Sequence, residues 1–255
     1  MLGIVPPLGG SPGGGRSSIP SPRVAAIERL RALVGSRGRV GVVPPPLEPV
    51  TVAAVAPGHL STGIAGLDDW LHGWPQHGPV ELVGQAGSGR LALVIPLLER
   101  LTCQGRSVVL VDPMHQVHPP GLGRVDLARL VLVRPPGERV AWAAEQVARS
   151  GAVDVLVVVD APPFGRGGVR LARAAEAGGM AVFVLSERPE VELPASLRLE
   201  SVGWQGGQVR VRCTRSRDGR MIGERLIAPS EAPTTETPGA RPPVGIVRRR
   251  RIGAG

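Results

Sequence analysis

The stretch that decides the fold is PVELVGQAGSGRLALVIPLLERLTCQ, residues 79 to 104. It opens with PVELV at 79 to 83, a short apolar run of the kind expected for a buried strand. The glycine-rich segment GQAGSGRL at 84 to 91 follows, and the rest is helix-like up to residue 104. A strand, a tight turn and a helix in this order predict one unit of a parallel sheet covered by helices.

The same alternation continues along the chain. Further short, valine-rich runs predict buried strands at 107–111, 130–133, 153–159 and 180–185. Helix-like stretches lie between several of these runs, at 138–150 and 168–178. After residue 195 the pattern changes to SLRLESVGW, GQVRVRCTR and GERLIA, joined by glycine-containing turns. The sequence therefore predicts an α/β fold, a mostly parallel sheet flanked by helices, with a C-terminal antiparallel extension.

Composition divides the chain into four parts. Residues 1–22 are rich in Gly, Pro and Ser and are predicted to be disordered, as is the Arg-rich tail at 229–255. Residues 23–50 form an appended arm, in which RVAAIERLRALV at 23 to 34 has helical spacing and PPPLEP at 44 to 49 acts as a linker. The folded core is predicted at 51–228.

The charge of the chain limits its chemistry and its partners. The 255 residues carry a net charge of +9, and all 30 basic residues are Arg. With no Lys, the chain cannot use a lysine amine as a base, a Schiff base or a phosphate ligand. The excess of Arg favours a polyanionic partner such as nucleic acid, or an acidic protein surface.

Cysteine and hydropathy exclude other classes. Cys103 and Cys213 are too few for a disulfide framework or a zinc site, and five scattered His add no ligand spacing, so no metal site is expected. No apolar run approaches the ~20 residues that span a bilayer, and the first residues lack the pattern of a secretion signal. The sequence predicts a cytoplasmic protein without a membrane partner.

The turn at 84–91 has the frame of a phosphate-binding loop. Two glycines, Gly84 and Gly89, are separated by four residues, and the candidate loop consists of Gly84, Gly87, Ser88, Gly89, Arg90 and Leu91. An active loop carries Lys and then Ser or Thr after the last glycine, to hold phosphates and magnesium, whereas this chain has Arg90 and Leu91. The alternative is a glycine-rich turn that binds nothing. That alternative is favoured by Pro96, which is expected to kink the following helix from within.

Three segments together resemble a known family. STGIAGLDDWLHGWPQHGPVELVGQAGSG at 61 to 89, GRSVVLVDPMHQ at 105 to 116 and GERVAWAAEQVARSGAVDVLVVVD at 137 to 160 resemble the ATPase core of the RecA recombinases. The resemblance covers roughly residues 23 to 220 and implies a RecA-like fold. Within that superfamily the chain looks most like the ImuA family, RecA-like accessory proteins of bacterial damage-induced mutagenesis, because the loop is altered and the C-terminal tail is basic.

The resemblance also implies that catalytic groups have been lost. Met114 stands where the family carries the glutamate that activates water, and methionine cannot act as a base. Glu187 stands where a glutamine senses the γ-phosphate. Asp160 is the match for the magnesium aspartate, but its strand is one residue too long, which turns a side chain to the other face unless a bulge absorbs it. For Asp112 and Asp160, capping of a turn is the alternative to a ligand role.

Contacts with DNA or partners are expected at arginines. The family's two DNA-binding loops correspond to 161–170, where Phe164 either stacks on bases or packs beneath the loop, and to 187–197, which is acidic. Dense arginine without interleaved aromatics suits phosphate contact or an acidic protein groove. The candidates are Arg166, Arg170, Arg210, Arg212, Arg215, Arg217, Arg248, Arg249, Arg250 and Arg251.

The sequence therefore predicts a RecA-like pseudo-ATPase, an accessory or adaptor protein in DNA damage tolerance, with no cofactor; binding of ATP and magnesium stays open. The resemblance implies an ImuB-like protein and RecA as partners, an error-prone polymerase indirectly, and single-stranded DNA as a further candidate. The alternative is an active or residually active DNA-dependent ATPase of the RecA superfamily, with Arg90 in place of Lys.

Overall fold

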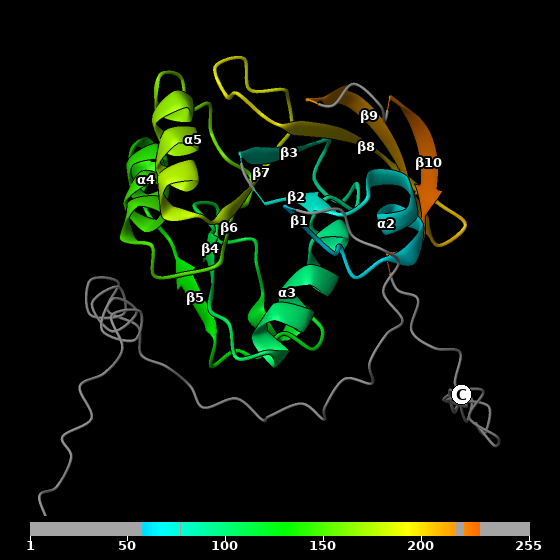
Figure 1. Cartoon of the computed structure of the whole chain (residues 1–255), viewed down its shortest axis with the longest axis horizontal. Helices are drawn as coiled ribbons and strands as arrows, with labels where there is room; N and C mark the ends of the chain where they lie inside the picture. Colours follow the sequence, from blue (N-terminus) through cyan, green and yellow to red (C-terminus); the bar gives the residue numbers. More distant parts are fainter. Residues whose placement is uncertain (1–57, 77, 218–221, 230–255) are drawn as a thin grey trace, which may run out of the picture.

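The computed structural model describes residues 58–76, 78–217 and 222–229. Its centre is an eight-stranded sheet with the strand order β10-β9-β8-β3-β7-β6-β4-β5 (Figure 1). The sheet is parallel from β5 to β8, and β8, β9 and β10 are antiparallel. The strands are β3 (Pro79–Val83), β4 (Val108–Val111), β5 (Leu130–Val133), β6 (Val155–Val158), β7 (Ala181–Ser186), β8 (Leu197–Gln205), β9 (Gln208–Ser216) and β10 (Gly223–Ile227). A small separate sheet pairs β1 (His59–Leu60) with β2 (Trp74–Pro75).

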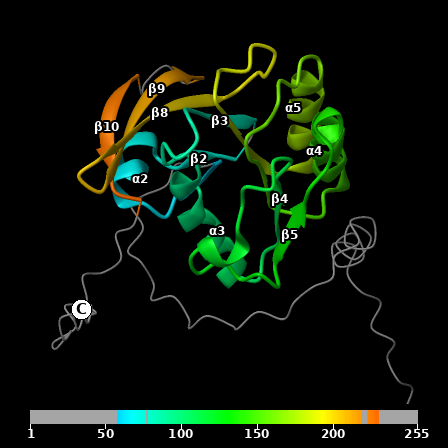
Figure 2. The same cartoon turned by 180° about the vertical axis from the view of Figure 1, so that it is seen from behind.

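Helices cover both faces of the large sheet, as Figures 1 and 2 show from opposite sides. They are α2 (Ala65–Leu71), α3 (Ile95–Cys103), α4 (Val140–Ser150) and α5 (Gly167–Gly178). Alternate side chains of each strand enter different cores: Leu110 packs with α2 and α3, whereas Val109 packs with α4 and α5. Because both faces of the parallel part are covered, β4, β5 and β6 are continuous apolar runs without alternating polar residues.

The predicted fold class is confirmed. Every strand predicted from residue 79 onward is present within a residue or two of its expected bounds, and the antiparallel extension follows the parallel part as expected. The predicted disordered segment 1–22, the arm at 23–50 and the tail from residue 230 lie outside the described residues. Among the described residues, no helix is both long and apolar enough to cross a bilayer.

The expected kink at Pro96 is wrong. The segment 90–104 is not one helix: a 3-10 turn at Leu91–Leu93 comes first, and α3 begins at Ile95. Pro96 therefore lies in the first turn of α3, where its missing N–H would have had no helical partner. The proline helps to start the helix rather than bend it.

The two cysteines differ in their surroundings, which gives a first testable prediction. Cys213 is buried in β9, and burial raises the pKa of its thiol, whereas Cys103 at the end of α3 is exposed. Because the thiolate is the reactive form, iodoacetamide at pH 8 should label Cys103 and leave Cys213 unmodified in the folded protein. Mass spectrometry of native and urea-unfolded samples checks this, and rapid native labelling of Cys213 would contradict it.

Candidate functional site

The glycine-rich turn lies at the carboxyl end of β3, in the middle of the sheet. The N–H of Gly84 donates to the carbonyl of Ser186 at the end of β7, at 3.0 Å. Gly89 has a φ of 99°, and a Cβ there would lie 2.6 Å from the side chain of Val209. Only glycine fits this combination of left-handed backbone and close approach. The turn is therefore pressed against the β8–β9 hairpin.

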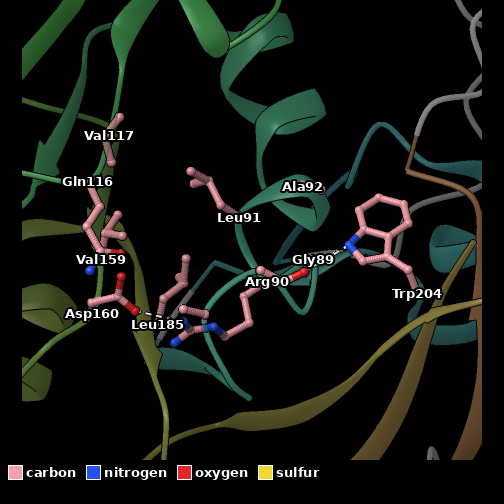
Figure 3. Close-up of a pocket in the computed structure, with 12 residues that line it drawn as sticks. Gly89, Arg90, Leu91, Ala92, Gln116, Val117, Val159, Asp160, Leu185 and Trp204 are labelled. Carbon is pink, nitrogen blue, oxygen red and sulfur yellow. Dashed lines mark hydrogen bonds and ion pairs between the residues drawn. The ribbon is translucent and has the colours of Figure 1, made fainter.

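A pocket of about 290 Å³ opens beside this turn (Figure 3). It combines one ion pair with an aromatic ring, an amide and several apolar side chains. Its lining residues are Ala86, Gly87, Gly89, Arg90, Leu91, Ala92, Gln116, Val117, Val159, Asp160, Leu185 and Trp204. The loop residues Gly87, Gly89, Arg90 and Leu91 thus line the same pocket as Asp160.

The central contact of the pocket is an ion pair between Arg90 and Asp160. The Nη2 atom of Arg90 lies 2.7 Å from Oδ1 of Asp160, and the side chains are only 6% and 15% exposed. Figure 3 shows the guanidinium reaching from the turn toward Asp160. The Nη1 atom of Arg90 is buried without a partner among the described residues. The cation that follows the last glycine is therefore neutralised by the protein's own carboxylate.

A left-handed backbone at Asp160 explains how this carboxylate reaches the pocket. Along β6, Val155 and Val157 face the α3 core, and Leu156 and Val158 face the α4–α5 core. Strict alternation would direct residue 160 toward the α4–α5 side. Asp160 has a φ of 46°, which turns the chain after Val159 and directs the carboxylate into the pocket. The extra residue noted in the sequence is thus absorbed in a turn, not in a bulge.

The residues of the pocket do not fit a magnesium ion and a nucleoside triphosphate. Leu91 lines the pocket where a metal-ligating hydroxyl is needed, and it cannot bind a cation. The helix that should point its first N–H groups at a phosphate starts only at Ile95. A polyphosphate would also have to displace Asp160 from Arg90 and then face a negative carboxylate. The described residues include no group of three or more His, Cys, Asp or Glu positioned to hold a metal.

Asp112 and Met114 follow β4, and neither side chain lines the pocket. The buried carboxylate of Asp112 accepts the N–H groups of Gln116 at 2.9 Å and Val117 at 3.1 Å, and Arg134 lies 3.4 Å away. These are the contacts of a carboxylate that caps a turn. The side chain of Met114 is 62% exposed and does not line the pocket. Gln116 does line it, although no motif in the sequence marks this position.

The two segments that correspond to DNA-binding loops are tied to the core by Glu190. Its N–H donates to the buried Glu81 of β3 at 2.5 Å, and its carboxylate accepts the N–H of Phe164 at 2.8 Å. Arg198 of β8 donates to Glu81 and to the carbonyl of Glu190. Phe164 is buried in the α4–α5 core, so packing is its role and base stacking is not. Glu187 is exposed and outside the pocket.

The candidate contact arginines fall into two groups. Several are already paired: Arg170 with Glu145, Arg212 with Glu224 and Glu200, and Arg210 with Glu224 and Gln205. The side chains of Arg166, Arg215 and Arg217 are exposed and form no ion pair within the described residues. Glu200 of β8 and Glu224 of β10 therefore offset part of the positive charge that the sequence suggests for phosphate contact. Arg248, Arg249, Arg250 and Arg251 lie outside the described residues.

The β8–β9 hairpin contributes contacts that the sequence did not reveal. The indole N–H of Trp204 donates to the carbonyl of Gly87 at 3.1 Å, and the hydroxyl of Ser201 donates to the carbonyl of Ser88 at 2.6 Å. Both bonds hold the glycine-rich turn from the hairpin side. No local signal in SLRLESVGW indicates that these side chains reach back more than a hundred positions along the chain.

The chain is similar to known proteins over part of its length. The chain is 38% identical over 105 residues to the protein RecA of Gluconobacter oxydans, a match that covers 39% of this chain and 30% of that protein. It is 35% identical to RecA of Clostridium acetobutylicum and 34% identical to RecA of a Nitratiruptor species, with the same coverage. No protein-family model matches the chain.

Together the fold and these matches define a RecA-like core. The chain matches about 30% of the length of these relatives.

Proposed function

We propose that this chain is a RecA-like pseudo-ATPase that acts as an accessory or adaptor protein in DNA damage tolerance. The observation that carries the proposal is the ion pair of Arg90 with Asp160 beside Leu91. A phosphate loop works by presenting an unpaired cation and a metal ligand to the nucleotide. In this chain the cation is neutralised internally and the metal ligand is replaced by an alkyl side chain, so the core is built to hold its shape without a nucleotide.

The anchored loops support the adaptor role. In a motor protein, segments at the ends of the strands must move when the nucleotide changes. Here Glu190 connects the segment at 187–197 to Phe164 and to Glu81, and Arg198 closes the network. Such bonds favour a fixed surface. We infer that the protein acts by presenting surfaces to partners, with an ImuB-like protein and RecA as the first candidates and single-stranded DNA as a further one, in support of translesion synthesis.

The proposal predicts that the purified protein does not hydrolyse ATP above a buffer blank, with or without magnesium and single-stranded DNA. Leu91 and Met114 lack the metal and base chemistry that phosphoryl transfer requires. A coupled phosphate-release assay measures turnover. A non-hydrolysable ATP analogue should also leave the melting temperature unchanged, because only a ligand of the folded state raises it. DNA-stimulated turnover that disappears in Arg90→Ala would refute the proposal and support the alternative of an active ATPase.

The partner role needs its own experiment. An affinity-tagged full chain, expressed in cells exposed to a DNA-damaging agent, should retain an ImuB-like protein or RecA after washing at moderate salt. Mass spectrometry identifies the retained proteins, and the tag alone is the control. If repeated experiments recover neither protein, the result would count against the adaptor role even if the ATPase assay is negative.

A further inference from the structure

Helices α4 and α5 carry an exposed face that includes Arg166 and Arg170, two of the predicted contact arginines. The two helices pack side by side at the end of the molecule opposite β10, as both views show (Figures 1 and 2). The face, called the α4–α5 face below, consists of Trp142, Arg149, Arg166, Val169, Arg170 and Arg173. On α4, positions 142 and 149 are two turns apart; on α5, positions 166, 169, 170 and 173 form one stripe. An ion-pair network joins the two stripes.

That network centres on Glu145. Its buried carboxylate forms two ion pairs. Oε1 lies 2.7 Å from Nη2 of Arg149 on the same helix, and Oε2 lies 3.0 Å from Nε of Arg170 on α5. One negative charge therefore pairs with two guanidiniums and leaves one positive charge in excess. Arg166 and Arg173 are exposed and form no ion pair among the described residues. Glu176 is also exposed on α5, one turn after Arg173, so four arginines stand against the two carboxylates of Glu145 and Glu176 and the face keeps a net positive charge.

An exposed indole lies among these charges. Trp142 is 58% exposed, and Val169 of α5 is exposed as well. Tryptophan and arginine are the residue types that dominate binding energy at protein interfaces, because they combine a large apolar surface with charged or polar groups.

We propose that the α4–α5 face docks an acidic segment of a partner protein, with an apolar side chain of that segment packed on Trp142. Charge complementarity selects an acidic partner, since Arg166 and Arg173 form no ion pair with any carboxylate in the described part of the chain. DNA fits the face less well. Surfaces that hold single strands combine several stacking rings with unpaired cations, whereas this face has one indole and two of its four guanidiniums share Glu145. The inference is independent of whether the glycine-rich turn binds a nucleotide.

Fluorescence anisotropy with the full chain tests the proposal. The probe is a short fluorescein-labelled peptide of alternating Glu and Leu; a Gln and Leu peptide and oligo(dT) are compared with it. The wild-type protein should bind the Glu and Leu peptide, and the Gln and Leu peptide should bind more weakly. The variants Trp142→Ala and Arg166→Ala/Arg173→Ala should each weaken binding by about tenfold, the effect expected of an interface anchor.

Arg215→Ala/Arg217→Ala is the matched control. It removes two exposed arginines from the β8–β9 end of the molecule and should leave peptide affinity within about twofold of the wild-type value, as for residues outside an interface. All three variants alter exposed side chains, so their thermal transitions should coincide with that of the wild type. The proposal would be overturned if the wild-type protein did not bind the Glu and Leu peptide, or if either face variant bound it as tightly as the wild type. It would also be overturned if the control variant lost as much affinity as the face variants, or if oligo(dT) bound more tightly than the peptide and in a Trp142-dependent way.

Discussion

Arg198→Ala should lower the free energy of unfolding by about 3–5 kcal/mol, the range measured when one partner of a buried ion pair is removed. The reason is Glu81, whose side chain in the middle of β3 is 0% exposed and is neutralised by Arg198. Without the guanidinium, a carboxylate remains in the core with only the N–H of Glu190 as a partner. Urea unfolding followed by circular dichroism measures the change.

Arg212→Ala is the matched control for that experiment. Arg212 lies on the next strand, and its contacts with Glu224 and Glu200 are solvent-exposed, with 51% of its own side chain accessible. Exposed pairs contribute at most about 1 kcal/mol. Replacing both buried partners, in Glu81→Leu/Arg198→Met, should recover most of the loss because no charge stays buried. Equal unfolding midpoints for Arg198→Ala and Arg212→Ala would show that the buried ion pair contributes no more to the free energy of unfolding than the exposed pairs do.

The parallel part of the fold was predictable because its central strands are buried on both faces. A strand such as Val108–Val111 has no polar residue at all, so it is visible as a short apolar run between a glycine-containing turn and the next polar segment. The glycines at the helix ends and hairpins supplied the boundaries. The start of α3 was not predictable in the same way, because apolar residues recur from Leu91 without interruption and only the backbone changes from a 3-10 turn to an α-helix.

The candidate site was only partly predictable. Its loop is a local motif, so the altered Arg90 and Leu91 could be recognised at once. The partner of Arg90 is Asp160, 70 positions away along the chain. Asp160 reaches Arg90 because its own backbone is left-handed, and the spacing of apolar residues does not predict such a conformation. The sequence does carry one further signal: Glu81 is a charged residue inside an otherwise apolar strand, PVELV, and such a residue must find a cation when it is buried.

Asp160→Ala is expected to be at least as damaging as Arg198→Ala, with a loss of about 3–5 kcal/mol in the free energy of unfolding. The Arg90 side chain is 6% exposed, and one of its terminal nitrogens already lacks a partner among the described residues. Removing Asp160 leaves the whole guanidinium charge buried without a counterion. Asp69→Ala, an exposed aspartate on α2, is the matched control and should change stability by no more than about 0.5 kcal/mol.

A double-mutant cycle separates the ion pair from the other effects of these substitutions. Arg90→Met/Asp160→Ala removes both charges while a flexible side chain still fills the space beside the glycine-rich turn. If the pair is what holds the turn, the double variant should be more stable than Asp160→Ala alone, because the buried charge is gone, and the two single losses should not add. Additive losses would mean that Arg90 and Asp160 act separately, and the turn would then have to be held mainly by Trp204 and Ser201 from the β8–β9 hairpin.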